Sequence, residues 1–209
     1  MSGGVRQPHF EAQFDIASTM LAQQAGLALS VAPDRGDGAR MSYLRFEDTA
    51  TGIDVFFDDV QGTTNPANFV ETQIATGLSR SSVHTAKFVI DFVSGPSNDV
   101  VKIYMDGVLV HTGTSWENYY RFDSESNPTL VSNSRTVDSL LFRAGGDSVP
   151  SNLGKGYLFD NVSLFSGPTP VVVPPAPTNK EQCKKDGWKT YTNPSFKNQG
   201  ECVAYTNHN

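Results

Sequence analysis

The sequence predicts an all-β protein: a two-sheet antiparallel sandwich of the jelly-roll type, followed by a Pro-rich linker and a small disulfide-closed C-terminal segment. About ten short segments with alternating apolar residues follow one another at intervals of roughly 8 to 14 residues. Gly, Pro, Asn and Asp clusters separate these segments, and no stretch has the length and period of a long helix. Many short strands without long helices are typical of sandwiches and jelly rolls.

The expected strands lie in the first 165 residues, and each combines β-branched or aromatic residues with a two-residue alternation. In chain order, the sequence predicts strands at residues 9–16, 26–32, 41–47, 53–60, 69–77, 84–93, 101–105, 108–110, 137–144 and 157–165.

The strongest local signal is a hairpin at residues 101–110. Val101, Ile103 and Met105 alternate with polar partners, and an Asp-Gly pair separates this run from the apolar run 108–110. Because a type I′ turn needs φ > 0 at both central residues, Asp106 and Gly107 suit it.

Composition and charge exclude two classes of partner. The chain has 209 residues and a formal net charge of −6, and its basic residues are scattered, so no nucleic-acid partner is expected. No apolar run approaches the length of about 18 residues that a membrane span needs. The first residues lack the pattern of a signal peptide, so we expect a removed leader or a longer parent chain.

The composition changes after residue 166. We predict a sandwich over residues 1–166, a Pro-rich linker over 167–178 with polyproline II character, and a small Cys-containing segment over 179–209. The last segment is too small to bury a sufficient core by itself. A disulfide between Cys183 and Cys202 would close it and would place the protein in an oxidising, extracellular compartment. The alternative is two free thiols on a disordered tail.

Four runs resemble a known group of proteins: VVKIYMDGVLVHTG, SWENYYR, VDSLLFR and GKGYLFDNVSLF. They are similar to the bacterial branch of the concanavalin A-like lectin/glucanase superfamily, with laminin-G-like jelly rolls, over roughly residues 10–165. The ending CKKDGW…FKNQGECV is similar to a short Cys-containing tail of secreted bacterial proteins.

The resemblance implies an extracellular fold but no particular reaction. Such domains usually begin with further strands before the one that matches residues 10–16. We therefore expect an open sheet edge, which favours self-association or a partner chain there.

The sequence disfavours catalysis. Glucanases of the superfamily carry a Glu-x-Asp-x-x-Glu motif on one strand, and this sequence has none. The nearest carboxylates are Asp123 with Glu125, in a polar loop, and Asp54 with Asp58, which share one strand face in the manner of a solvent-facing stripe. The four histidines have no metal-ligand spacing: His9, His84, His111 and His208.

Aromatic residues favour binding instead. Trp116, Tyr119 and Tyr120 cluster between strands, and Arg143 lies on a neighbouring segment. Aromatic rings stack on sugars while Arg bonds their hydroxyls. The alternative is that these rings cap one end of the sandwich core.

Asp160 shares its strand parity with Leu158, Val162 and Leu164, which predicts partial burial. A buried carboxylate must be paired, hydrogen-bonded or bound to a metal. The family resemblance implies a structural Ca²⁺ at such a position; hydrogen bonds from the backbone or an Arg are the equal alternative.

These observations favour a secreted or cell-surface carbohydrate-binding module without catalytic activity. The alternatives are a structural subunit of an extracellular assembly that uses an open edge strand, and an atypical polysaccharide hydrolase or lyase.

Overall fold

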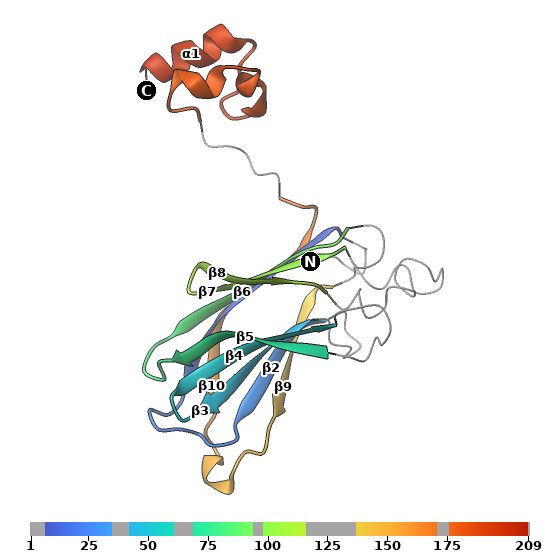
Figure 1. Cartoon of the computed structure of the whole chain (residues 1–209), viewed down its shortest axis with the longest axis vertical. Helices are drawn as coiled ribbons and strands as arrows, with labels where there is room; N and C mark the ends of the chain where they lie inside the picture. The colour runs from blue at the N-terminus through green and yellow to red at the C-terminus, as the bar shows by residue number, and fades with distance from the viewer. Residues whose placement is uncertain are drawn as a thin grey trace, which may run out of the picture. The chain divides into compact units, whose positions relative to one another are not determined.

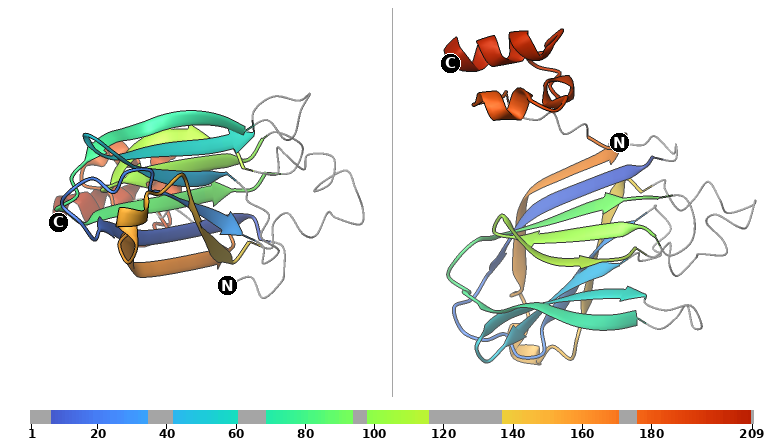
Figure 2. Two further views of the ribbon diagram at one scale, coloured as in Figure 1. Left: turned by 90° about the horizontal axis from the view of Figure 1, so that it is seen from below. Right: turned by 45° about the horizontal axis from the view of Figure 1, so that its top comes forward.

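The computed structural model describes residues 7–34, 42–60, 69–93, 98–115, 137–170 and 176–208. Contacts between residues divide the chain into two compact units, Met1–Thr169 and Pro170–Asn209. The first unit consists of two five-stranded antiparallel sheets that form two layers, as Figures 1 and 2 show. The predicted antiparallel sandwich is therefore confirmed.

The first sheet has the order β10-β1-β6-β7-β8, and we call it the β1 sheet. Its strands are β1 (His9–Ser18), β6 (His84–Asp91), β7 (Val100–Met105), β8 (Val108–Gly113) and β10 (Tyr157–Gly167). Asp106 and Gly107 connect β7 to β8 with φ values of 51° and 81°, so the predicted turn with two positive φ angles is also confirmed.

The second sheet has the order β5-β4-β3-β2-β9, and we call it the β3 sheet. Its strands are β2 (Ala28–Asp34), β3 (Tyr43–Thr49), β4 (Gly52–Val60), β5 (Phe69–Leu78) and β9 (Ser139–Gly145). A single short 3-10 helix, η1 (Pro150–Asn152), lies in the connection from β9 to β10 among the described residues.

The core lies between the inner faces of the two sheets. Alternate residues of each strand point inward, and the largest fully buried side chains come from both sheets: Phe10, Phe14, Phe46, Phe57, Phe88, Ile16, Leu44, Ile53, Ile90 and Ile103. Full burial of one such side chain stabilises the fold by roughly 1.5–3 kcal/mol. The remaining alternate positions form the two outer faces of the sandwich.

The expected open edge beside residues 10–16 is wrong. Strand β1 pairs with β10 on one side and with β6 on the other, so it lies inside its sheet. The first strand pairs with the last strand of the sandwich, a contact that local sequence patterns do not report. The edges of this sheet are β10 and β8.

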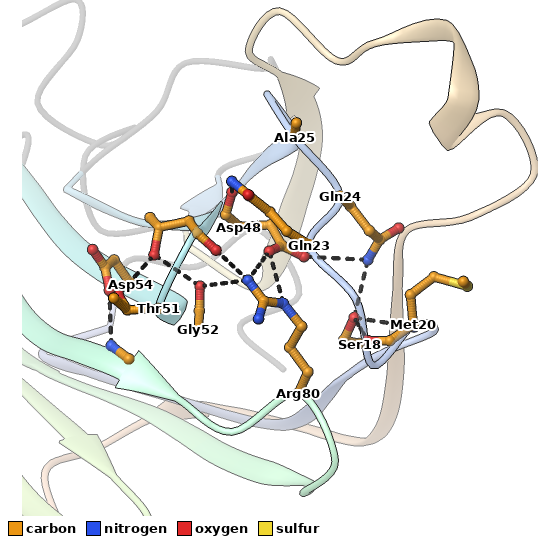
Figure 3. A network of polar contacts seen from close by, with 12 residues as sticks. Ser18, Met20, Gln23, Gln24, Ala25, Asp48, Thr51, Gly52, Asp54 and Arg80 are labelled. Atoms are coloured by element: carbon orange, nitrogen blue, oxygen red, sulfur yellow. Dashed lines mark hydrogen bonds and ion pairs between the residues drawn. The ribbon is translucent and has the colours of Figure 1, made fainter.

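A buried ion pair joins the turns at one end of the sandwich (Figure 3). Arg80 donates two hydrogen bonds to Asp48 Oδ1, at 2.6 and 2.9 Å, and a further one to the carbonyl of Thr49. The buried amide of Gln24 donates to Ser18 Oγ and to the carbonyl of Gly156, both at 3.0 Å. The Arg80 bonds join the β5–β6 connection to the end of β3, and the Gln24 bonds join the β1–β2 connection to the β9–β10 connection. Gln23 links the two groups by donating a 3.3 Å hydrogen bond to the Asp48 carbonyl.

The second unit is small and closed by a disulfide between Cys183 and Cys202, which confirms the predicted pairing. It contains the 3-10 helices η2 (Lys180–Cys183) and η3 (Gly187–Thr190) and the helix α1 (Gln199–His208). Trp188, Phe196 and Val203 pack against the buried disulfide and Tyr191. No helix in the described part of the chain is long and apolar enough to cross a membrane.

Candidate carbohydrate-binding face

A hollow with a volume of about 720 Å³ lies on the outer face of the β1 sheet. Strands β1, β6 and β7 and the turn after β7 line it, and we call it the β1–β6–β7 hollow. Its lining residues are Glu11, Gln13, Thr85, Lys87, Val89, Tyr104, Asp106 and Gly107. This volume lies within the range of ordinary small-molecule sites, about 300–1,000 Å³.

Strand register arranges the lining in rows across the sheet. Gln13, Lys87 and Tyr104 are cross-strand partners and form the middle row. Because side chains two residues apart share a face, Glu11 and Val89 form the row on one side of it. Thr85 and Asp106 lie on the other side, where the Asp106 amide donates to the Thr85 carbonyl at 2.8 Å.

Glu11 is the centre of a chain of polar contacts at one end of the hollow. Its Oε2 is 2.6 Å from Lys87 Nζ, and its Oε1 is 3.1 Å from His9 Nε2. The other ring nitrogen of His9 is 2.7 Å from Asp91 Oδ1. Burial alone would raise the pKa of Glu11, but the hydrogen bonds from Lys87 and His9 outweigh burial and hold the pKa below its ordinary value.

Asp106 is held in a similar way at the other end. Its Oδ2 is 2.8 Å from His84 Nδ1, and its Oδ1 accepts a 2.8 Å hydrogen bond from the Thr85 amide. Burial would raise the pKa of Asp106, and these hydrogen bonds outweigh it, so the pKa lies below its ordinary value. Nearby, Asp15 accepts hydrogen bonds from Asn161 and Thr85, both at 2.6 Å, which also lower its pKa.

The hollow therefore combines one aromatic ring with several polar groups that are held in place. Tyr104 is half-buried in the middle row and presents an apolar ring with a hydroxyl. Gln13 is exposed beside it and offers an amide that both donates and accepts. A ring for stacking next to fixed donors and acceptors is chemistry that suits the apolar faces and hydroxyls of a sugar.

Most of the predicted ligand-binding residues lie outside the described part of the chain. This applies to Trp116, Tyr119 and Tyr120. Arg143 lies on β9, where its cross-strand partner is Ser30, so it belongs to the outer face of the β3 sheet. It is exposed there, close to Arg45, which lines the same small pocket.

The predicted partial burial of Asp160 is wrong. Asp160, Leu158 and Val162 are exposed, and Tyr157, Phe159 and Leu164 contact the core instead. The pairing of β1 with β10 shifts between Gln13 and Asp15, where β10 has one extra residue and Asn161 has a φ of 49°. This β-bulge changes which parity faces the core, so alternation counted through Asn161 fails.

Partial burial of Asp160 was the reason to predict Ca²⁺ there, and the exposed position of this side chain removes that reason. The register brings the carboxylate of Asp15 opposite Asp160, but Asp15 is already bonded to Thr85 and Asn161. Asp160 Oδ1 accepts the 2.7 Å hydrogen bond of the Asn161 amide. Among the described residues, no group of three His, Cys, Asp or Glu side chains is placed to hold a metal ion. Calcium at this position stays a prediction.

The carboxylates considered for catalysis are engaged or outside the described residues. Asp54 accepts hydrogen bonds from Thr76 Oγ1 at 3.1 Å and the Gly77 amide at 2.8 Å, and Asp58 is 3.4 Å from Arg45 Nε. Asp54 and Asp58 are four residues apart on an extended strand, so they lie roughly 13 Å from each other. Glycosidases need about 5–9.5 Å between their two carboxyl groups. Asp123 and Glu125 lie outside the described residues.

The hollow itself was not predicted. Its residues occupy the solvent-facing positions of three strands, where polar alternation looks like any exposed sheet face. The one available signal is that Glu11, Gln13, Lys87 and Tyr104 all have outward parity on predicted strands. Local periodicity does not state that these strands are neighbours.

Comparison with known proteins gives a likeness to solved structures. No protein-family model matches the chain, and no curated protein sequence matches it. An alginate lyase from Pseudomonas aeruginosa aligns at 12% identity and a TM-score of 0.45, covering 78% of this chain and 66% of the lyase chain. Sheep galectin-11, solved with glycerol, aligns at 7% identity and a TM-score of 0.40, covering 77% of this chain and 93% of the galectin.

A third match is the CBM40 of the IT-sialidase from Ruminococcus gnavus, solved with α2,3-sialyllactose. It aligns at 12% identity and a TM-score of 0.33, covering 72% of this chain and 82% of that domain. At such identities and TM-scores, these three matches assign neither a ligand nor a reaction to this chain.

Proposed function

We propose that this protein is an extracellular carbohydrate-binding module and that the β1–β6–β7 hollow is its binding site. The observation that carries the proposal is the middle row of the hollow, where Tyr104 offers a stacking surface beside Gln13 and Lys87. The Cys183–Cys202 disulfide supports an oxidising compartment, where such modules meet glycans.

The carboxylates of the hollow support binding rather than hydrolysis. A glycosidase needs one carboxylic acid whose raised pKa keeps it protonated as a general acid. Glu11 and Asp106 both have lowered pKa values, so both are ionised at neutral pH. Neither is suited to protonate a leaving group.

The test is glycan binding by variants of the middle row, first on a glycan array and then by calorimetry on the sugars that bind. We expect Tyr104→Ala to weaken binding about ten-fold or more, because an aromatic anchor at the centre of a site contributes most of the affinity. Gln13→Ala should weaken it less, because it removes the amide hydrogen bonds and leaves the ring.

Gln73→Ala is the matched control for Gln13→Ala, since Gln73 is an exposed glutamine on the outer face of the β3 sheet. It should bind as the unmodified protein does. Unchanged affinity in Tyr104→Ala, with loss in Trp116→Ala or Tyr120→Ala, would move the site to the loop aromatics. Release of reducing ends or of unsaturated uronate products from a glycan would show that the protein is an enzyme and would contradict the proposal of binding alone.

A structural role in an extracellular assembly is the second candidate, favoured by apolar residues on the edge strands of the β1 sheet. Leu158 and Phe165 on β10 are 61% and 42% exposed, and Val108 on β8 is 64% exposed. Exposed apolar edge strands recruit further strands. Light scattering that shows a monomer at high concentration would remove this candidate.

A further inference from the structure

We propose that Glu11 makes the β1–β6–β7 hollow selective for uncharged sugars, by occupying Lys87, the ammonium group that a sugar carboxylate would need. This inference depends on the proposed function and specifies the class of ligand. It assigns Glu11 a specificity-determining role rather than a catalytic one.

The basic side chains around the hollow already contact carboxylates of the protein. Lys87, which is the only ammonium group among the lining residues, is 2.6 Å from Glu11. His9 lies between Glu11 and Asp91 and is 3% exposed, so a ligand has little access to it. His84 faces Asp106 with one ring nitrogen and the Ser79 carbonyl with the other.

Charge in and around the hollow also opposes an acidic sugar. Glu11 and Asp106 both line it, and Asp15 accepts a hydrogen bond from Thr85 at the same end as Asp106. Lys102 is a further cation of this outer face, two residues from Tyr104, but it is not among the lining residues. Residues 1–169 contain eleven basic and nineteen acidic side chains, a net charge of −8, which repels polyanions at low salt.

Neutral polar groups remain available to a ligand. Gln13 is exposed, and neither its side chain nor the hydroxyl of Tyr104 forms a hydrogen bond with another described residue. An amide and a phenol hydroxyl pair with sugar hydroxyls without requiring a charge. A uronic acid at the same place would bury its carboxylate beside Glu11 or Asp106, with no unpaired cation among the lining residues to compensate it.

The experiment compares matched sugar pairs that differ only in the oxidation of C6. Oligosaccharides of glucose, mannose and galactose and the corresponding oligouronates are measured against the full chain. We expect a neutral member to bind and its uronate counterpart to bind about ten-fold or more weakly at low salt. This difference should shrink as the salt concentration rises, because salt screens the repulsion.

The variant Glu11→Gln tests the residue directly. It keeps the shape of the side chain and releases Lys87, so the ratio of neutral to uronate affinity should fall about ten-fold. Glu47→Gln is the matched control. Glu47 pairs with Arg45, two residues away on the outer face of β3, just as Glu11 contacts His9 two residues away on β1. It should leave the ratio unchanged.

The outcomes separate the two proposals. Uronates that bind as tightly as their neutral counterparts, or a ratio that Glu11→Gln leaves unchanged, would overturn the selectivity and leave carbohydrate binding intact. Failure of every neutral and acidic glycan to bind would overturn the proposed function and this inference with it. Should Glu11→Gln not fold, the salt dependence of the unmodified protein decides: a uronate penalty that salt does not reduce is evidence against the role of charge.

Discussion

The side chain of Glu11 shows how one carboxylate can organise a binding surface. It accepts from Lys87 with one oxygen and contacts His9 with the other, and His9 in turn contacts Asp91. A half-buried carboxylate that was left alone would take up a proton more readily, yet these partners stabilise its charge. The same contacts therefore set the charge of the hollow and contribute to the stability of the sheet.

This arrangement predicts acid sensitivity. The pKa of Glu11 in the folded state lies below its ordinary value of 4.5, so the unfolded chain binds more protons in the acidic range. Stability from this group is present above about pH 4.5 and is lost as the pH falls through the folded pKa. The lowered pKa values of Asp15 and Asp106 act in the same direction.

Urea unfolding between about pH 7 and pH 3 measures the effect. The unmodified protein should lose stability below about pH 4.5, and Glu11→Gln should lose less over the same range, because its side chain does not titrate. Identical pH profiles for the two proteins would show that the contacts of Glu11 do not favour its charged form.

Strand β10 shows where an element departs from its sequence pattern. Its bulge inserts one residue relative to β1, and Asn161 takes the left-handed conformation there. The side-chain Nδ2 of Asn161 donates to Asp15, which ties the bulge to the neighbouring strand. Asn accepts positive φ more readily than other residues with a side chain, which explains its presence at this position.

Substitutions at the bulge should depend on backbone conformation. Both Asn161→Gly and Asn161→Val remove the hydrogen bond to Asp15, but a β-branched residue is strained at a φ of 49°. Thermal or urea unfolding should show the Val variant to be less stable than the Gly variant by about 1–2 kcal/mol.

The same two substitutions at Ser163 provide the control. Ser163 is an exposed position of β10 outside the bulge, and it is not among the residues with positive φ. In an extended conformation Val is favoured over Gly, so the order should reverse. A Gly variant that is less stable than the Val variant at both positions would contradict the strain at Asn161.

The contrast between hairpin and bulge shows what periodicity can predict. The run from Val101 to Met105 alternates and is followed by an Asp-Gly pair, so the first strand and the turn of the hairpin follow from local sequence. The register shift of β8 opposite Ile103 and Tyr104 does not. The apolar residues of β10 keep their alternation in the sequence, but the strand has one extra residue relative to β1. Asp160 was therefore predicted on the wrong face. The bulge is defined by pairing with β1, which is about 150 residues distant in sequence, and local patterns do not contain it.

At the scale of the whole molecule, the same limit applies to the site. The sequence predicted ten strands and a sandwich because each strand carries its own pattern. The hollow depends on β1 lying beside β6 and β6 beside β7, and this order includes partners that are far apart in the chain. Sequence reasoning therefore found the aromatic run Trp116–Tyr120, which is local, and missed the middle row with Gln13, Lys87 and Tyr104.

The two units of the chain differ in charge. Residues 170–209 contain five lysines and three acidic residues, a net charge of +2, against −8 for residues 1–169. In the second unit, Lys184 pairs with Glu181 and Lys189 with Asp186. A stretch rich in proline joins the two units. The net charge measured on the whole chain therefore combines a negative contribution from the first unit with a positive one from the second.

The most direct measurement is a map of backbone amide chemical shifts during titration of the full chain with a neutral oligosaccharide selected on the glycan array. The account predicts that the shifts gather on β1, β6 and β7, around Gln13, Lys87 and Tyr104, and that the outer face of the β3 sheet around Arg45 and Arg143 stays unchanged. Shifts confined to the β3 sheet or to the segment with Trp116, or no shift with any sugar, would contradict a binding site in the β1–β6–β7 hollow.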